Sequence, residues 1–509
     1  MDNPDLKPQL EAVVPGVFDA YASLKSHDGM GLHTSSGSFY NHTLFGRDGS
    51  MSAKFVTDFD HDIVREVIVA LAALQGTAYD SKTQEEPGRI HHELRDFRTW
   101  RGTLAERLVF TPWHFAWGVK DKQLLTYFSQ DTTASYIRLV HKYAGRIDAA
   151  ILLKKVKNYH GETITVADSL IKAAEWIMGK LSEGDVMQEQ RRNKLSLPFQ
   201  TYQDSLTTYY RSDGHLADYR GPMSYVEIQA YSASALYDMV DMFPNHEHAL
   251  EWRETARRMQ NALIKRFWDK DDEFLASAID RRGKIDIHNV SAGWTLNTSL
   301  WAELDSKKRA SYVGPIVDRL FSDEFLTPVG LRTMSKDQPP ALSEVVGYHS
   351  AEVVWPMFSF MVVEGLRRHR LYGLAEQLEN RILNGLNATG DFDEFFIVDR
   401  GGTVVLPDKK GPDGELKVQM PPEKRIAFSV VPAMTMAKRA SYKDPRLAPV
   451  GWQKDLEARI LDRIPHVERA KPGEALKAIG PVKRMKLRRW AGAWDSAKYF
   501  WSETRRMKK

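Results

Sequence analysis

The 509-residue chain contains no cysteine, which excludes disulfide bridges, thiolate metal sites and catalysis by a thiol. It also lacks an uninterrupted apolar run long enough to cross a bilayer. Its first residues, Met1 to Pro8, lack the basic start and apolar stretch of a secretory signal. These absences suit a reducing compartment, and we expect a soluble, cytoplasmic protein.

The chain has little excess of either charge, since it contains 71 basic and 67 acidic residues. From His466 to Lys509, however, 13 Lys and Arg face only 4 Asp and Glu. Trp490, Trp494, Tyr499, Phe500 and Trp501 lie in the same segment. We expect this basic, aromatic C-terminal extension (463–509) to pack on the rest of the protein or to form a solvated helix. Contact with an anionic membrane surface or with nucleic acid is the alternative, but no nucleic-acid partner is expected, and the sequence does not indicate an oligomeric state.

Apolar residues recur at helical spacing in many segments. The clearest are 63–74, 134–143, 166–178, 226–240, 249–267, 353–366 and 372–383. Long loops rich in Gly, Pro and aromatic residues separate them. We therefore expect an all-α fold, a closed ring of helical hairpins whose loops gather at one end. A short β-hairpin is expected at 395–398 and 403–406, after an N-terminal helical lead-in (1–30) and within one catalytic domain (31–462).

Two acidic residues far apart in the chain have aromatic and amide neighbours. Asp204 follows Phe-Gln-Thr-Tyr-Gln, and Glu394 stands in Asp-Phe-Asp-Glu-Phe-Phe. A glycosidic bond breaks when one carboxylic acid protonates the leaving oxygen while a second carboxylate activates water or attacks the sugar, and aromatic rings pack on the sugar faces. The two segments thus predict a sugar-cleaving site.

Other polar segments are candidates for binding the sugar. Arg47 and Asp48 could hold two neighbouring hydroxyls, although a helix cap beside a salt bridge is the plainer interpretation. His92 and Glu93 invite a zinc-helix interpretation, but the second histidine of that motif is missing; a structural ion pair or a binding wall remains. Asp131 is equally consistent with a helix cap.

Two further candidate groups surround the predicted catalytic carboxyls. Tyr202, Glu227 and Gln229 place polar groups in an apolar context, where they are costly to bury without partners. His349, Glu352 and Trp355 stand at the start of another predicted helix. We expect all six to contribute to substrate binding.

Taken in order over residues 30 to 440, these segments resemble the amylo-α-1,6-glucosidase and glycogen debranching type of glycoside hydrolase, a six-hairpin glycosidase related to glucoamylase and trehalase. The resemblance is carried by Phe-Gly-Arg-Asp (45–48), Pro-Gly-Arg-Ile-His-His-Glu (87–93), the Tyr-to-Thr segment 127–133, Gln-Asp-Ser (203–205) with Val-Glu-Ile-Gln (226–229), Trp-Pro (355–356) and Glu394. It implies an (α/α)6 toroid, with Asp204 as general acid and Glu394 as general base of an inverting enzyme, and carboxyls about 6.5–9.5 Å apart. Arg47, Asp48, His92, Glu93, Asp131, Glu227 and Gln229 would line the terminal-sugar subsite.

The resemblance further implies an exo-acting enzyme that removes a terminal, α-linked glucose from an oligosaccharide or glycoconjugate, without cofactor or metal. A trehalase-like disaccharide hydrolase and a catalytically silent carbohydrate-binding protein are the alternatives. The chain departs from the family pattern in two places. Glu352 replaces part of a His-Asn-Gly element and is a reserve candidate for the base, and Ile426 to Val430 lack a Trp of the family.

Overall fold

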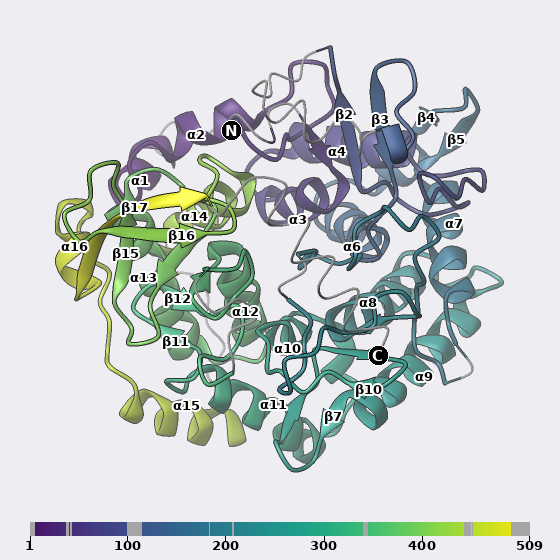
Figure 1. The fold of residues 1–509 in the computed structure, drawn as a ribbon. Coiled ribbons are helices and arrows are strands. Elements are labelled where there is room, and N and C mark those ends of the chain that lie inside the picture. The colour runs from purple at the N-terminus through teal and green to yellow at the C-terminus, as the bar shows by residue number, and fades with distance from the viewer. Residues whose placement is uncertain are drawn as a thin grey trace.

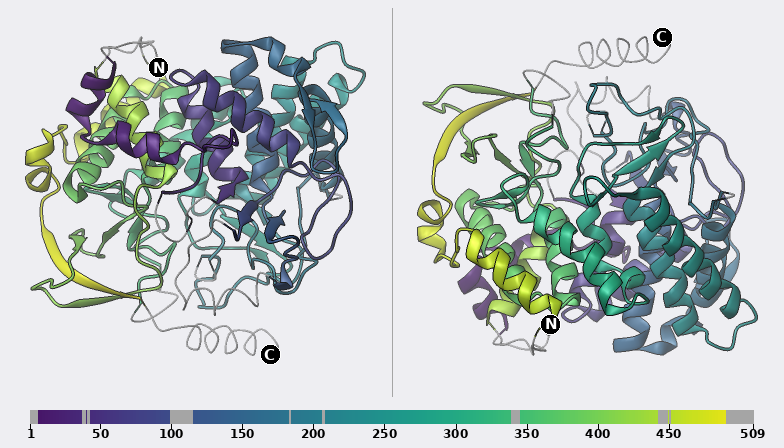
Figure 2. Two further views of the ribbon diagram at one scale, coloured as in Figure 1. Left: turned by 90° about the horizontal axis from the view of Figure 1, so that it is seen from above. Right: turned by 90° about the horizontal axis from the view of Figure 1, so that it is seen from below.

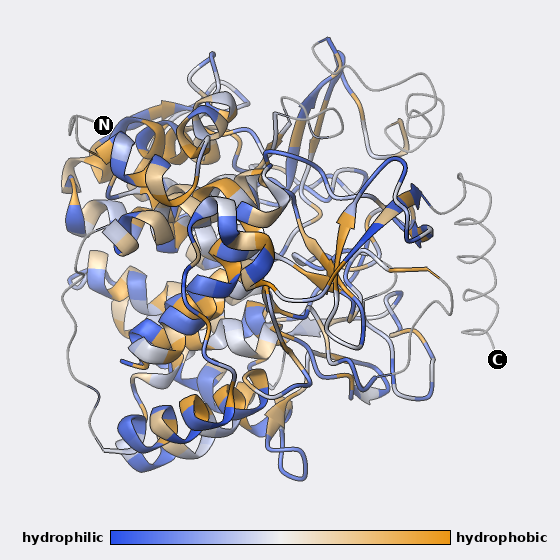
Figure 3. Cartoon of the chain, turned by 90° about the vertical axis from the view of Figure 1, so that its left-hand side faces the viewer, coloured by the Kyte–Doolittle hydropathy of each residue, from blue (hydrophilic) through white to orange (hydrophobic). Residues whose placement is uncertain are grey.

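The computed structural model describes residues 6–36, 40, 43–98, 115–182, 184–205, 208–338, 345–441, 449 and 451–489. Helices gather on one side of the molecule, while strands and long loops gather on the other (Figures 2 and 3). The helices are α1 (Leu6–Val13), α2 (Val17–Leu24), α3 (Gly46–Val56), α4 (His61–Ala73), α6 (Asp131–Arg146), α7 (Val166–Gly179), α8 (Val226–Met242), α9 (Ala249–Phe267), α10 (Ser291–Trp294), α11 (Ser306–Leu320), α12 (Pro356–Arg368), α13 (Tyr372–Thr389), α14 (Ala427–Ser441), α15 (Trp452–Arg463) and α16 (Ala475–Ala478).

The strands are short and form several small sheets. They are β1 (Leu44–Phe45), β2 (Glu93–Asp96), β3 (Gln123–Thr126), β4 (Lys155–Lys157), β5 (Thr163–Thr165), β6 (Ser224–Tyr225), β7 (Trp268–Asp269), β8 (Phe274–Leu275), β9 (Ala278–Asp280), β10 (Gly283–Lys284), β11 (Leu326–Thr327), β12 (Gly330–Leu331), β13 (Val353–Val354), β14 (Phe396–Val398), β15 (Val404–Pro407), β16 (Glu415–Val418) and β17 (Val482–Arg489). The larger sheets have the orders β1-β2-β3, β10-β9-β6 and β13-β14-β15-β17-β16.

Inner helices follow one another around a ring (Figure 1). Helix α3 contacts α6, and the contacts continue through α8, α10, α12 and α14, which returns to α3. Outer helices α4, α7, α9, α11 and α13 each pack on the inner helix that precedes them, while α1 and α2 pack on α14. The N-terminal segment therefore covers the last inner helix.

The helices predicted from periodicity are confirmed, except that Val353 and Val354 form strand β13 ahead of α12. The hairpin is also confirmed, since β14 pairs with β15 and Ile397 lies opposite Val405. The all-α expectation needs correction, because the chain carries a five-stranded sheet besides minor hairpins. A regular six-hairpin ring stays a prediction, as α10 has only four residues and continues in 3-10 turns at 295–297 and 299–301.

Part of the basic C-terminal extension belongs to this sheet. Strand β17 lies between β15 and β16 and runs parallel to both, with Val405 opposite Lys483 and Leu416 opposite Leu487. The aromatic residues from Trp490 onward lie outside the described residues. Contact of the extension with a membrane or nucleic acid, and the domain boundaries 1–30, 31–462 and 463–509, stay predictions. None of the described helices combines the length and apolar content that crossing a bilayer requires.

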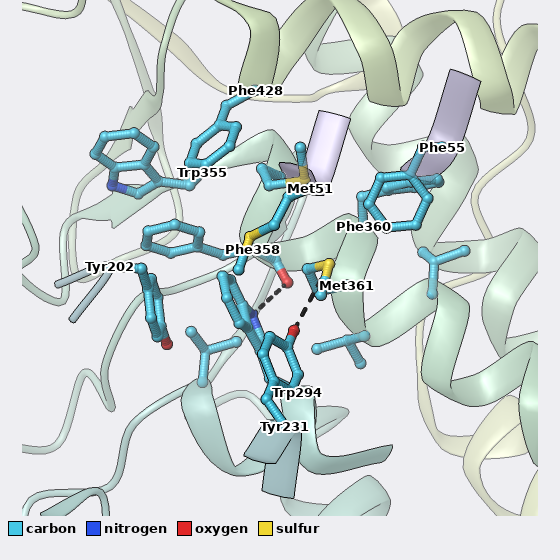
Figure 4. Close-up of a cluster of buried hydrophobic side chains, with 14 of the residues drawn as sticks. Met51, Phe55, Tyr202, Tyr231, Trp294, Trp355, Phe358, Phe360, Met361 and Phe428 are labelled. Carbon is cyan, nitrogen blue, oxygen red and sulfur yellow. Dashed lines mark hydrogen bonds between the residues drawn. The ribbon is translucent and has the colours of Figure 1, made fainter. Parts of the chain in front are cut away.

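The core of the ring is aromatic and aliphatic. Trp252, Trp294 and Trp301 are fully buried, and Figure 4 shows Trp294 among Tyr231, Phe358 and other large side chains. Burying one such side chain contributes about 1.5–3 kcal/mol. The core therefore holds the inner helices against one another and fixes where their ends lie.

Gly46, the first residue of α3, allows a close backbone approach. A Cβ atom there would lie 2.2 Å from the carbonyl oxygen of His91 and 2.7 Å from a methyl carbon of Thr132. The amide of Gly46 donates to the carbonyl of His92 at 2.9 Å. The glycine thus lets α3 start directly against the segment that leads into β2.

We expect Gly46→Ala to destabilise the protein by about 1–3 kcal/mol, because backbone atoms must move to admit the methyl group. Gly145→Ala in α6 is the matched control, since its Cβ would meet nothing within 4 Å. Alanine favours a helix over glycine by up to about 1 kcal/mol, so the control should be neutral or stabilised. Urea unfolding measures both, and equal stability of the two variants would contradict the steric argument.

Candidate functional site

A cavity of about 250 Å³ opens at the end of the ring where the inner helices begin. It collects side chains from segments spread over most of the chain. The lining residues include Arg47, Asp48, His92, Glu93, Tyr202, Asp204, His349, Trp355 and Glu394, together with Tyr40, Arg95, Ser205, Tyr348, Gln419 and Phe428. Nine of the predicted site residues therefore face one space.

Strand register brings the predicted segments together. In the sheet β1-β2-β3, Phe45 lies opposite Glu93, and Glu93 lies opposite Thr126. The start of α3, the His92–Glu93 segment and the chain that leads into α6 are therefore neighbours. On the other side of the cavity, β13 pairs with β14, Val354 opposite Phe396, which places the segment before Trp355 beside Glu394.

Arg47 is the central cation of the site. Its buried guanidinium lies 3.7 Å from the carboxylate of Asp48, 3.5 Å from Asp131 and 4.0 Å from Asp204. Burial acts to lower the pKa of Arg47, but the three carboxyl groups outweigh it and raise this pKa above its usual range. One permanent positive charge thus links α3, α6 and the loop that holds Asp204.

Asp204 has a raised pKa, although its carboxyl group is partly exposed to the cavity. Its side chain is 26% exposed. Burial raises its pKa to about 6, Arg47 opposes the shift and Asp131 adds to it. Burial likewise raises the pKa of neighbouring Asp48 to about 7. Desolvation disfavours the charged form of such groups, and an acid near neutrality can donate a proton at physiological pH.

Glu394 is held by two donors. The hydroxyl of Tyr348 donates to its Oε1, and the backbone amide of Glu423 donates to its Oε2 at 3.1 Å. Burial raises the pKa of Glu394 to about 8, although both hydrogen bonds favour the ionised form. The hydroxyl of Tyr348 also lies 3.2 Å from that of Tyr40. This pair of tyrosines fixes the orientation of the carboxyl group.

Aromatic rings form one wall of the cavity. Trp355 stacks on Phe358 at 4.8 Å and on the imidazole of His349 at 5.3 Å. Tyr202 stacks on Trp294 at 3.9 Å (Figure 4). Apolar ring faces of this kind suit the C–H faces of a pyranose. The rings pack mainly on one another, and Tyr202, Trp355 and Phe358 present their remaining surface to the cavity beside the carboxyl groups.

Both histidines in the cavity are neutral. Burial, and secondly Arg47, lowers the pKa of His92 and of His349 well below the usual range. Nδ1 of His349 lies 2.9 Å from the hydroxyl of Ser205, whereas both ring nitrogens of buried His92 lack a hydrogen-bond partner within the described structure. Glu93 accepts a hydrogen bond from Arg95 at 2.6 Å. His92 thus lines the cavity with its ring, while both of its nitrogens are buried.

Four predicted binding residues do not line the cavity. Asp131 lies behind Arg47, fully buried. Glu227 accepts a hydrogen bond from Thr201, and both polar atoms of the Gln229 side chain bind the backbone of Met187. These three side chains therefore contact other parts of the protein and not the cavity.

Glu352, the reserve candidate for the base, is directed elsewhere. It accepts a hydrogen bond from Ser350 at 2.8 Å and pairs with Arg400 at 2.9 Å. The neighbouring sheet therefore engages this carboxylate, and the structure brings only Asp204 and Glu394 of the catalytic candidates into the cavity.

Several residues that line the cavity were not predicted from the sequence. Tyr348 stands directly before His349 in a segment already singled out, so its position was a usable signal. Tyr40, ahead of Phe45, and Arg95, after Glu93, also stand next to predicted segments, whereas Gln419 had no such signal. Gln419 accepts a hydrogen bond from the amide of Tyr348 at 2.9 Å only because β16 lies near this loop in the folded chain.

No group of metal ligands falls in the described part of this cavity. Among the described residues, His141, Asp238 and Asp241 are the group close enough to share an ion. They lie at the other end of the ring, in α6 and α8. The cavity itself presents two carboxyl groups, those of Asp204 and Glu394, that can donate or accept a proton.

Comparisons with known proteins agree with this chemistry. Residues 171–404 match the model of the mannosylglycerate hydrolase MGH1-like glycoside hydrolase domain. This segment includes Asp204 and Glu394 but less than half of the chain. No curated protein matches the sequence.

Two similar solved structures are of the GH63 mannosylglycerate hydrolase from Thermus thermophilus. The one in complex with glucose has 13% identity and a TM-score of 0.54, over 84% of this chain and 99% of that one. The one in complex with Tris has 13% identity and a TM-score of 0.53, over 83% and 99%. At this identity the likeness shows a shared fold. Together with the domain match, it supports a glycoside hydrolase and does not single out the debranching type.

Glu227 generates a prediction for stability against pH. Burial raises its pKa from 4.5 to about 8, with Thr201 opposing the shift. The folded state therefore holds a proton that the unfolded chain releases above pH 4.5, and this contribution to stability is lost as the pH rises to about 8. Each pKa unit is worth about 1.4 kcal/mol.

We expect Glu227→Gln to flatten the fall in melting temperature between pH 5 and pH 8 and to be more stable than the parent at pH 8. Exposed Glu254→Gln in α9 serves as the control. Thermal unfolding followed by circular dichroism measures the effect. A parallel pH dependence in parent and Glu227→Gln would show that this carboxyl group is ionised in the fold.

Proposed function

We propose that this protein is an inverting, exo-acting glycoside hydrolase that removes a terminal, α-linked glucose from an oligosaccharide or small glycoconjugate. The observation that carries the proposal is the convergence of Asp204 and Glu394, from segments 190 residues apart in sequence, on one aromatic-walled cavity. The glycoside hydrolase domain match over residues 171–404 supports the reaction class. The (α/α)6 toroid is the architecture we infer from the ring of inner helices.

In the proposed reaction, the protonated carboxyl of Asp204 donates its proton to the glycosidic oxygen as the bond from that oxygen to the anomeric carbon breaks. The carboxylate of Glu394 takes a proton from water, and the water oxygen bonds to the anomeric carbon from the opposite face. Two donors to Glu394 favour its ionised form, which supports its role as the base. Arg47, Asp48, His92 and Glu93 would bind the hydroxyls of the terminal sugar, with Asp131 holding Arg47.

The pKa values by themselves place the proton of the pair on Glu394 and leave Asp204 ionised, the reverse of the proposed roles. Burial raises the pKa of Asp204 to about 6 and that of Glu394 to about 8. The active form carries one proton on the pair, so a bell-shaped pH profile with limbs near these values follows from either assignment. The roles must therefore be separated by the leaving group.

A small glycoconjugate is favoured over a long glucan by two observations. The cavity of about 250 Å³ is slightly smaller than the ligand pockets of about 300–1,000 Å³ that hold drug-sized molecules. The matched domain is described by a hydrolase of mannosylglycerate, a hexose joined to a small acid. A hexosyl group joined to a small polar molecule is thus the second candidate substrate. A trehalase-like disaccharide hydrolase and a catalytically silent binding protein remain the alternative functions.

Incubation with α-glucosyl and α-mannosyl substrates tests the proposal directly. The panel should contain α-1,6 and α,α-1,1 disaccharides, longer glucans, and glucosyl- and mannosylglycerate, with anomeric protons followed by NMR. We expect the β-anomer of the released sugar to appear first. Initial release of the α-anomer would contradict inversion, and saturable binding with no product from any member would support the silent binding protein.

Variants at the two carboxyls test the assignment of acid and base. Asp204→Asn should lose at least about 100-fold in kcat on a natural substrate, because general acid catalysis is typically worth 10²–10⁴. It should lose much less on a dinitrophenyl glycoside, whose leaving group needs no proton. Glu394→Gln should lose activity on both, while Glu352→Gln serves as the control. The opposite pattern at positions 204 and 394 would reverse the roles.

A further inference from the structure

A second, larger cavity of about 850 Å³ lies at the opposite end of the ring, where the inner helices end. The aromatic cluster of Figure 4 lies between the two spaces. Its Tyr202, Phe358 and Phe428 line the candidate active site, whereas its Phe55 lines the second cavity. The second cavity is therefore separate from the proposed catalytic carboxyls.

The acidic side chains of this second cavity already have basic partners. Asp58 pairs with Lys142 at 3.4 Å and Arg146 at 3.6 Å, Glu364 pairs with Arg439 at 2.5 Å, and His141 lies 3.3 Å from Asp238 and 3.6 Å from Asp241. His141 uses a different ring nitrogen toward each carboxylate. This geometry suits an ion-paired imidazole better than a shared metal.

Four further cations line the same cavity, and one of them, Lys438, donates to the carbonyl of Asp58 at 3.5 Å. Lys54 and Arg368 have no carboxylate within 4.0 Å among the described residues. The guanidinium of Arg138 lies 4.0 Å from Asp238, which it shares with His141; it also donates to the carbonyl of Asn297 at 2.5 Å and lies over the ring of Tyr231. Burial, and next Arg138, lowers the pKa of both Lys54 and Arg368. The three other basic side chains thus line one cavity, with Lys54 half-buried and Arg368 exposed to solvent.

Helix polarity does not account for all three cations. The C-terminal end of a helix attracts cations, worth about 0.3–1 kcal/mol each. Lys142 is used in this way, because its Nζ donates to the carbonyl of Lys54 at 2.7 Å. The ammonium of Lys54 and the guanidinium of Arg368 donate to no carbonyl within the described structure. These two side chains therefore keep their N–H donors available for an anion in the cavity.

We propose that the second cavity binds a phosphate ester of a sugar or polyol, with the phosphate held by Lys54, Arg138 and Arg368. A phosphate group carries about two negative charges at pH 7 and several strong acceptor oxygens, and guanidinium groups bind it through paired N–H donors. Ser234, Ser299 and Thr435 also line the cavity. The two serine hydroxyls lie 2.8 Å apart and that of Thr435 donates to the carbonyl of Val431, so they would contact the remainder of the ligand chiefly as acceptors. The site is independent of the proposed hydrolysis.

Thermal unfolding and ³¹P NMR line broadening test this site, with inorganic phosphate and glycerol 3-phosphate as probes and sodium chloride keeping the ionic strength constant. We expect saturable binding that raises the melting temperature, with the ester bound more tightly. Lys54→Met and Arg368→Gln should each weaken binding at least about tenfold, since charged phosphate contacts are lost. Arg146→Gln is the matched control, because Arg146 is 64% exposed and already pairs with Asp58.

The free protein gives a second readout. Without phosphate, Lys54→Met should raise the melting temperature, because it removes a half-buried cation that has no carboxylate within 4.0 Å among the described residues. A lower melting temperature in this variant would mean that the ammonium stabilises the helix end, and would overturn the proposal. Equal phosphate binding by all variants, or no effect beyond that of chloride, would also overturn it. Equal affinity for the two probes would show that the site recognises the phosphate group alone, and would overturn the part of the proposal that concerns the ester.

Discussion

The buried charge of Arg47 is the constraint on which the site depends. One guanidinium lies within 4.0 Å of carboxyl groups from its own helix, from α6 and from the loop of Asp204. A buried cation is costly unless it is paired, so these three segments must meet for the fold to form. Burial, to which Asp131 adds, raises the pKa of Asp48 and Asp204 above that of free aspartates, although Arg47 opposes the shift.

The direction of the inner helices gives the ring two electrically different ends. Helices α3, α12 and α14 begin at the candidate active site, and α3, α6 and α12 end at the second cavity. Helix N-termini favour anions and C-termini favour cations. Carboxyl groups gather at the first end and lysines and arginines at the second, so the polarity of the fold matches the proposed chemistry at each end. The aromatic core shown in Figure 4 separates the two cavities.

Much of the fold followed from local patterns, because helical periodicity reports a buried face wherever it occurs. Segments 226–240 and 249–267 became α8 and α9 almost without change. The two-residue strands were not predictable, since Val353–Val354 or Leu44–Phe45 form strands only because a distant partner supplies the hydrogen bonds. The place of β17 in the sheet also escaped prediction, because its charged residues suggested a solvated tail.

The sequence by itself determined which chemical groups are available: no thiols, two carboxyls in aromatic surroundings, and the Arg47–Asp48 pair at a helix start. It could not decide which of them share a space. Glu227, Gln229 and Glu352 carry the same kinds of side chain as the cavity residues, yet Thr201, Met187 and Arg400 engage them elsewhere. Tertiary structure made that choice, because a polar side chain serves a ligand only if the fold has left its hydrogen-bonding capacity open toward a cavity.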